Sequence, residues 1–132
     1  MSVVIIGGGQ AGLQVADSLR SGGYQDGITV IAEEPGLPYQ RPPLSKDYLA
    51  PEGNPAPLPL RAASFFADKE ITLRSGVRAA AVDRTARTVT LSGGEQVGYR
   101  HLVFATGTAN RALTCPGADL PGVHLLRTLP DA

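Results

Sequence analysis

The first twelve residues constrain this chain most, because they join a short apolar run to three glycines at fixed spacing. Residues 3–6 are all valine or isoleucine, which is typical of a strand buried in a parallel sheet. Gly7, Gly9 and Gly12 follow in the G-x-G-x-x-G order of a dinucleotide-binding turn. In such a turn the first glycine permits a sharp bend and the second lets the backbone approach a pyrophosphate. The third permits close packing of the next helix, whose N–H groups point at the phosphates.

A glycine pattern alone is weak evidence, but the residues around this one support it. Residues 10–20 predict a helix with an apolar stripe formed by Ala11, Leu13, Ala16 and Leu19. Residues 28–31 predict a second strand, and Glu33 stands 21 positions after Gly12. A carboxylate at that place binds a ribose 2′-OH and repels a 2′-phosphate. The alternative is a Rossmann-like βαβ unit that binds nothing, but the strand, helix and acidic residue together favour dinucleotide binding.

Composition excludes several other classes of function. The chain has 132 residues, enough for one domain, and its twelve basic and twelve acidic residues give a net charge of zero. No overall field therefore favours nucleic acid or an anionic membrane. The single cysteine excludes an intrachain disulfide and any C-x-x-C metal or dithiol site. No run is long enough to span a membrane and no signal peptide is evident, so we expect a cytoplasmic protein without metal.

The middle of the chain changes character, because eight of the eleven prolines lie in residues 35–59. Proline excludes a continuous helix or a central strand there. Apolar and aromatic residues in the segment argue against a flexible linker, and a short helix is expected at residues 44–50. Further predictions are a helix at 62–69, a third parallel strand at 71–73, a three-stranded antiparallel meander within 77–100, a buried strand at 101–105 and an irregular tail at 108–132.

Four motifs, taken together, resemble a known family. They are the glycine turn at 7–12, Glu-Glu-Pro at 33–35, Pro-Tyr-Gln-Arg-Pro-Pro-Leu-Ser-Lys at 38–46 and Ala-Thr-Gly at 105–107. They are similar to the N-terminal FAD-binding region of NAD(P)H-dependent ferredoxin and rubredoxin reductases. That family includes putidaredoxin reductase and the reductases of aromatic-ring dioxygenases, and it is related to apoptosis-inducing factor. The resemblance implies an α/β, Rossmann-like FAD-binding domain with a parallel sheet, helices and a small three-stranded antiparallel meander.

The same resemblance implies roles for individual residues. The backbone of the glycine turn would line the FAD pyrophosphate and Glu33 would bind the adenosine ribose. Lys46 is the one catalytic candidate, because an ammonium near the flavin N5 edge stabilises charge on the reduced ring. Arg127 would reach the flavin or its phosphates. The full set of cofactor-binding residues that the resemblance implies is Gly7, Gly9, Ala11, Gly12, Glu33, Arg41, Pro42, Lys46, Ala79 through its backbone, Ala105, Thr106, Gly107 and Arg127.

Relative to the family, residues 1–132 are expected to be a partial FAD-binding domain. The family's NAD(P)H-binding domain and its C-terminal interface domain are expected to be absent, and no second G-x-G-x-x-G occurs in the sequence. The strand at 102–105 should then lie at an open edge of the sheet. Arginines at 74, 78, 84, 87 and 100 would form either a basic patch for an acidic ferredoxin or simply a solvated surface.

Three functional hypotheses remain from the sequence. In the first, the chain is the FAD-binding part of a reductase that passes electrons from NAD(P)H through FAD to an iron–sulfur ferredoxin or a rubredoxin. In the second, it is a truncated or split module that binds FAD or ADP without turnover and needs a second chain to complete its sheet. In the third, which follows the resemblance to apoptosis-inducing factor, redox state regulates protein contacts.

Overall fold

The computed structural model describes residues 2–49 and 58–132, which form two compact units. Unit 1 comprises Met1–Pro38 and Pro59–Gly107, and unit 2 comprises Tyr39–Leu58 and Thr108–Ala132. No helix within the described residues has both the length and the apolar character needed to cross a membrane.

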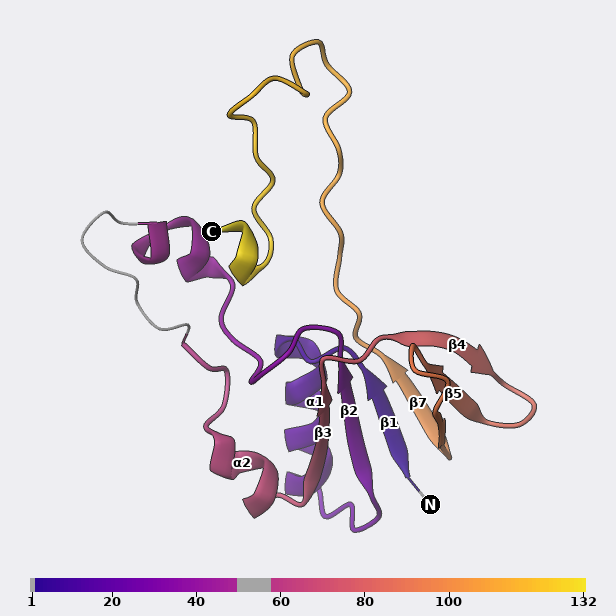
Figure 1. The fold of residues 1–132 in the computed structure, drawn as a ribbon. Coiled ribbons are helices and arrows are strands. Elements are labelled where there is room, and N and C mark those ends of the chain that lie inside the picture. Colours follow the sequence, from indigo (N-terminus) through magenta and orange to yellow (C-terminus); the bar gives the residue numbers. More distant parts are fainter. Residues whose placement is uncertain (1, 50–57) are drawn as a thin grey trace. The chain divides into compact units, whose positions relative to one another are not determined.

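A four-stranded parallel sheet forms the centre of unit 1 (Figure 1). Its order is β3-β2-β1-β7, with β1 at Val3–Ile6, β2 at Ile28–Ala32, β3 at Ile71–Ser75 and β7 at His101–Phe104. β1 lies between β2 and β7, and all of its residues are buried. The predicted strands at 3–6, 28–31 and 71–73 are therefore confirmed, as is their parallel pairing.

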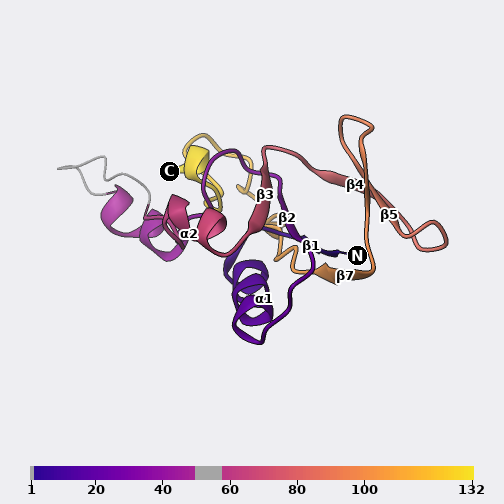
Figure 2. The ribbon, with the colours of Figure 1, turned by 90° about the horizontal axis from the view of Figure 1, so that it is seen from below.

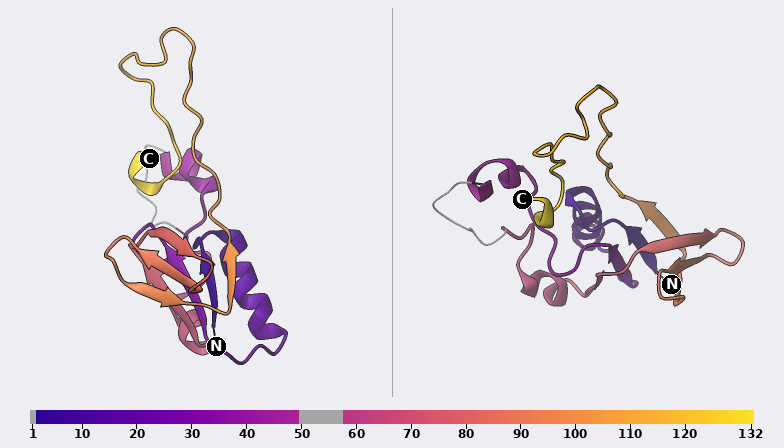
Figure 3. Two further views of the ribbon diagram at one scale, coloured as in Figure 1. Left: turned by 90° about the vertical axis from the view of Figure 1, so that its right-hand side faces the viewer. Right: turned by 45° about the horizontal axis from the view of Figure 1, so that its top comes forward.

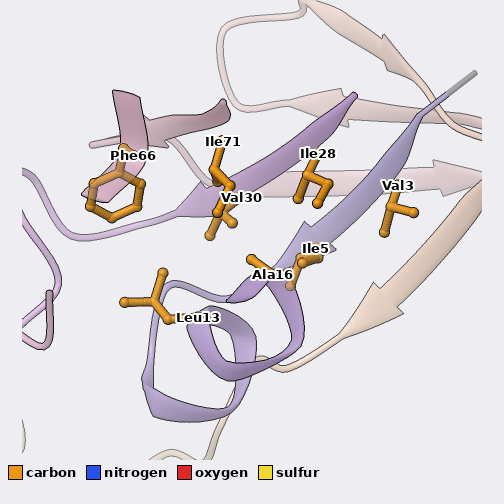
Figure 4. Close-up of a cluster of buried hydrophobic side chains, with 8 residues drawn as sticks. All are labelled: Val3, Ile5, Leu13, Ala16, Ile28, Val30, Phe66 and Ile71. Carbon is orange, nitrogen blue, oxygen red and sulfur yellow. The ribbon is translucent and has the colours of Figure 1, made fainter. Parts of the chain in front are cut away.

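The apolar side chains of β1 belong to two hydrophobic cores, because successive side chains of a strand point to opposite faces of a sheet. Val3 and Ile5 join a cluster with α1 (Gln10–Ser21) and α2 (Ala63–Asp68), shown in Figure 4. Val4 and Ile6 join a second cluster with side chains of the meander. Figure 2 shows α1 on one side of the sheet and β4 and β5 on the other. A sheet covered on both faces requires strands that are apolar throughout, which explains the sequence of β1.

The second sheet of unit 1 is the predicted antiparallel meander (Figure 3). Its order is β4-β5-β6, with β4 at Ala79–Asp83, β5 at Thr88–Leu91 and β6 at Gln96–Gly98. Val89 and Leu91 of the central strand are buried against the parallel sheet. The meander thus closes the face of the parallel sheet that α1 leaves uncovered.

Two expectations for unit 1 are wrong in detail. Ala11 does not belong to the buried stripe of α1: it is exposed, and the buried residues of the helix are Gly12, Leu13 and Ala16. The helix approaches the sheet so closely at its start that only a glycine fits there. The strand predicted at 101–105 exists, and β7 lies at the edge of the sheet, as expected. It is not buried, and 66% of Phe104 is exposed.

The helices in the described residues of unit 2 are short turns. The helix expected at 44–50 is replaced by two 3-10 turns, η1 at Pro42–Ser45 and η2 at Asp47–Leu49, and Ala50 lies outside the described residues. Two consecutive prolines begin η1, at positions where a helix needs no N–H group, and the chain leaves the helical conformation at Lys46, whose φ is −132° and ψ −106°. The tail is irregular, as predicted, except for a third turn, η3, at Leu129–Asp131.

Candidate functional site

The strand register brings the candidate residues of unit 1 to one edge of the parallel sheet. Ile6 of β1 is level with Ile31 of β2 and with Phe104 of β7, so the three strands end together. The Gly7 amide donates to the Ile31 carbonyl at 2.8 Å, and the Ala105 amide donates to the Ile6 carbonyl at 2.8 Å. The glycine turn, Glu33 and the Ala-Thr-Gly segment therefore leave the sheet side by side.

Gly7 and Gly12 are required by the fold itself. Gly7 has a φ of +119°, and a Cβ at this position would overlap the carbonyl oxygen of Ala105. A Cβ at Gly12 would overlap the carbonyl oxygen of Gly7 and contact the side chain of Ile5. Both contacts involve backbone atoms that cannot move aside, so each position accepts only glycine.

The fold itself does not require a glycine at position 9. Its φ of −76° and ψ of −173° are open to any residue, and a Cβ placed on it would meet no atom of the described residues within 4 Å. Gly9 is also the N-cap of α1, which has no side-chain cap and no acidic residue in its first turn. Within residues 2–49 and 58–132, the first amides of α1 therefore have no side-chain cap, as at helix N-termini that bind phosphate.

Glu33 follows β2 directly and is exposed at the same edge. Its Oε1 lies 3.5 Å from Nη1 of Arg78, and the two side chains are 67% and 71% exposed. An ion pair this exposed contributes little to stability, so the carboxylate remains accessible to a ligand. Two backbone hydrogen bonds, Val77 to Ala32 and Gly76 to Glu34, both 3.1 Å, bring the residues before Ala79 alongside Glu33.

The remaining candidates lie in unit 2 or at the end of unit 1. Pro42 is within η1, and the Lys46 amide donates to the Pro43 carbonyl at 3.0 Å while its side chain is exposed. Arg41 and Arg127 are brought together, because Nη1 of Arg41 donates to the carbonyl oxygen of Arg127 at 2.6 Å. In unit 1, Thr106 and Gly107 are exposed where the chain leaves β7.

Comparison with known proteins identifies this arrangement. All of residues 1–132 match the family described as pyridine nucleotide-disulphide oxidoreductase. The chain belongs to this family. It is 52% identical to rhodocoxin reductase of Rhodococcus erythropolis over its whole length, which is 31% of that protein. The resemblance to ferredoxin and rubredoxin reductases is thereby confirmed.

Two solved reductase structures agree with the fold. A ferredoxin reductase from Rhodopseudomonas palustris matches 98% of the chain with a TM-score of 0.88 and 48% identity, over 32% of its own length. The reductase in a putidaredoxin reductase–putidaredoxin complex matches 98% of the chain with a TM-score of 0.85 and 36% identity, also over 32% of its length. The chain spans about a third of these proteins, whose family binds FAD and uses NAD(P)H as substrate.

Sequence reasoning missed three polar residues that contact the predicted site residues or the backbone beside them. Arg78 pairs with Glu33, and Tyr39 and Asp131 hydrogen-bond the backbone next to Arg127. A signal for Asp131 was present, since Thr128-x-x-Asp131 is the pattern of a helix capping box. Arg78 and Tyr39 gave no such signal, because their partners are 45 and 90 residues away.

Two of the five arginines of the predicted basic patch are paired with acidic residues. Arg74 makes a two-point contact with Glu95, at 2.9 Å and 2.5 Å, and Arg78 pairs with Glu33. The hydrogen bonds from Arg74 hold the pKa of Glu95 below its usual value and raise the pKa of Arg74. The choice between a ferredoxin-binding patch and a solvated surface therefore concerns mainly Arg84, Arg87 and Arg100, which are exposed.

Proposed function

We propose that this chain is the FAD-binding part of a flavoprotein reductase and that unit 1 binds the ADP half of the cofactor. The observation that carries the proposal is the open space at Gly9, beside helix amides with no side-chain cap. The pyrophosphate would lie against the backbone of Gly7, Gly9, Ala11 and Gly12. Glu33 would bind the ribose, the backbone of Ala79 would contact adenine, and Ala105 to Gly107 would line the opposite side.

The flavin half is assigned to unit 2. Arg41, Pro42, Lys46 and Arg127 would contact it, with the ammonium of Lys46 near the N5 edge. A fixed positive charge there stabilises the anionic form of the reduced ring. Bound FAD supplies the redox chemistry itself, accepting a hydride and releasing its electrons one at a time. The exposed side chain of Lys46 is compatible with such a contact.

For the whole protein, we propose electron transfer from NAD(P)H to a ferredoxin or rubredoxin in the cytoplasm. Support comes from the relatives, which include a rubredoxin-NAD(+) reductase of Pseudomonas putida that is 39% identical over all 132 residues, or 34% of its own length. The 132-residue sequence contains a single G-x-G-x-x-G, so we expect the isolated chain to bind FAD without being reduced by NADH or NADPH.

Titration of the purified chain with FAD, followed by quenching of flavin fluorescence, tests the proposal. ADP should displace the cofactor, and ADP carrying a 2′-phosphate should displace it poorly, because Glu33 repels the additional charge. The Glu33→Gln variant should lose that discrimination. Failure of ADP to compete, or equal competition by the two nucleotides, would contradict the assignment of unit 1.

A second candidate is a cofactor-binding module that a separate polypeptide completes. Among the described residues, β7 has no partner on its outer side, and its Phe104 is largely exposed. An apolar groove of about 710 Å³ also runs along α1, lined in part by Ala11, Val15 and Leu19. Tyr24 borders the groove, and its buried hydroxyl has no hydrogen-bond partner in the described part of the chain.

Complementation distinguishes the two candidates. The part of rhodocoxin reductase that the match does not cover would be added as a separate polypeptide to the 132-residue chain. A module that needs a partner should bind FAD weakly alone and tightly in the mixture. Equal affinity with and without the second polypeptide would rule out the second candidate.

A further inference from the structure

Two distant segments of unit 2 are tied together by polar contacts that the sequence did not predict. Nη1 of Arg41 donates to the Arg127 carbonyl at 2.6 Å, and the Leu129 amide donates to the Tyr39 hydroxyl at 2.8 Å. The Arg41 guanidinium also lies over the Tyr39 ring, 5.5 Å from its centroid. These contacts join residues 86 and 90 positions apart. We call the group a clasp, composed of Tyr39, Arg41, Arg127, Thr128, Leu129 and Asp131.

Asp131 organises the other half of the clasp. Its Oδ2 accepts hydrogen bonds from the amide of Arg127 at 2.9 Å, the amide of Thr128 at 2.6 Å and the hydroxyl of Thr128 at 2.8 Å. The bonds from Thr128, and then the one from Arg127, hold the pKa of Asp131 below its usual value. One carboxylate oxygen thus fixes the backbone from which the Arg127 side chain extends.

The clasp also fixes the direction of the Arg41 side chain. A guanidinium is a rigid planar fork with five N–H donors, so anchoring one donor and one face orients the whole group. Here the anchored donor binds the Arg127 carbonyl, and the face lies on Tyr39. Of the two arginines that the proposed function assigns to the flavin half, Arg41 thus has its guanidinium held against Tyr39, and Arg127 has its backbone held by Asp131.

We propose that Tyr39 and Asp131 are positioning residues for the flavin half of the cofactor, acting through Arg41 and Arg127. This inference rests on the proposed function. Long side chains that are ordered before binding do not lose their freedom during it, which increases affinity for the group they contact. Breaking the clasp should therefore weaken binding of FAD, which has a flavin, and leave binding of ADP, which has none, unchanged.

The test compares Tyr39→Phe and Asp131→Asn with the wild-type chain, using FAD and ADP as separate ligands in calorimetric titrations. Tyr39→Phe removes a single hydroxyl, and Asp131→Asn removes the charge while keeping the shape. Each should weaken FAD binding about tenfold. The matched controls are Tyr48→Phe and Asp119→Asn in the same unit, which should bind both ligands as the wild type does.

The comparison between ligands separates positioning from a loss of folding. A variant that merely unfolds loses ADP as well as FAD, whereas a displaced arginine affects FAD alone. Amide NMR of the ligand-free chain provides a second readout, because opening the clasp should shift the resonances of Arg127 and Leu129. An opened clasp with unchanged FAD affinity, or equal losses for FAD and ADP, would overturn the proposal.

The proposed function and the positioning role are refuted by different results. If the wild-type chain binds neither ADP nor FAD, the proposed function is wrong and the positioning role falls with it. If the wild type binds both ligands and the two clasp variants bind FAD as tightly as the wild type does, only the positioning role is wrong. Retained ADP binding with about tenfold weaker FAD binding supports both.

Discussion

Replacement of each turn glycine by alanine should separate the demands of folding from those of the ligand. At Gly9 the added methyl group meets no atom within 4 Å in the part of the chain that the structure describes, and the backbone conformation is open to alanine. At Gly12 the same methyl group would overlap the carbonyl oxygen of Gly7. Gly9→Ala should therefore fold normally but bind ADP poorly, whereas Gly12→Ala should be destabilised.

The magnitudes follow from these surroundings. Alanine is a poorer N-cap than glycine by up to about 1 kcal/mol, but it reduces the freedom of the unfolded chain by a similar amount. The melting temperature of Gly9→Ala should thus stay within about 4 °C of the wild type. A backbone overlap such as that at Gly12 costs about 3 kcal/mol or more, which corresponds to a fall of roughly 12 °C.

For ADP binding, in contrast to stability, the substitution at Gly9 should have a large effect. Loss of one hydrogen bond between a helix amide and a charged phosphate costs about 1.5–3 kcal/mol, which weakens ADP binding about 10- to 150-fold in Gly9→Ala. Melting followed by circular dichroism, and calorimetric titration with ADP, measure the two effects separately. Gly93→Ala is the control, since a Cβ there also meets open space and the residue lies in the β5–β6 turn, away from the glycine turn.

Two results would refute this reasoning. Wild-type affinity of Gly9→Ala for ADP would show that no ligand approaches the backbone at this position. A melting temperature of Gly9→Ala as low as that of Gly12→Ala would show that the fold requires glycine at both positions. Either result would remove the main observation behind the proposed function.

Three further predictions concern stability, each measured by urea denaturation. Ile5→Ala should lower the free energy of unfolding by about 2–5 kcal/mol, because Ile5 is fully buried. Arg20→Lys should lower the free energy of unfolding by about 2 kcal/mol, because one ammonium cannot reach all four carbonyl oxygens that Arg20 binds. These belong to Tyr24, Asp26, Lys69 and Glu70. Arg74→Gln should lower the free energy of unfolding above the usual pKa of Glu95, and this loss should disappear as the pH falls through the lowered pKa of Glu95. Equal losses at neutral and acid pH would show that the Arg74–Glu95 contact does not stabilise the fold.

The sequence alone predicted the local elements of unit 1 well. Continuous valine and isoleucine at 3–6 indicated a strand covered on both faces, and the structure places α1 and the meander on those faces. The glycine turn and the positions of the strands and of the meander also depend on residues close together in the chain. Such features can be predicted from the sequence because backbone conformation and side-chain periodicity are local properties.

Other features depended on residues far apart in the chain. The exposure of Ala11 follows from how closely α1 approaches the sheet, which local periodicity does not contain. The open edge at β7, where Phe104 is exposed, was expected from the family resemblance and not from local periodicity. The turns η1 and η2 stand in place of the helix predicted at 44–50, because the chain leaves the helical conformation at Lys46.

The sequence by itself therefore determined the strand–turn–helix that opens the chain, the acidic residue after β2 and the family resemblance that they support. Tertiary structure alone decided which polar groups meet. Arg78 reaches Glu33 across 45 positions, and Tyr39 reaches Leu129 across 90. The physical reason is that backbone conformation depends on near neighbours, whereas a hydrogen bond between distant segments exists only after the chain has brought them together.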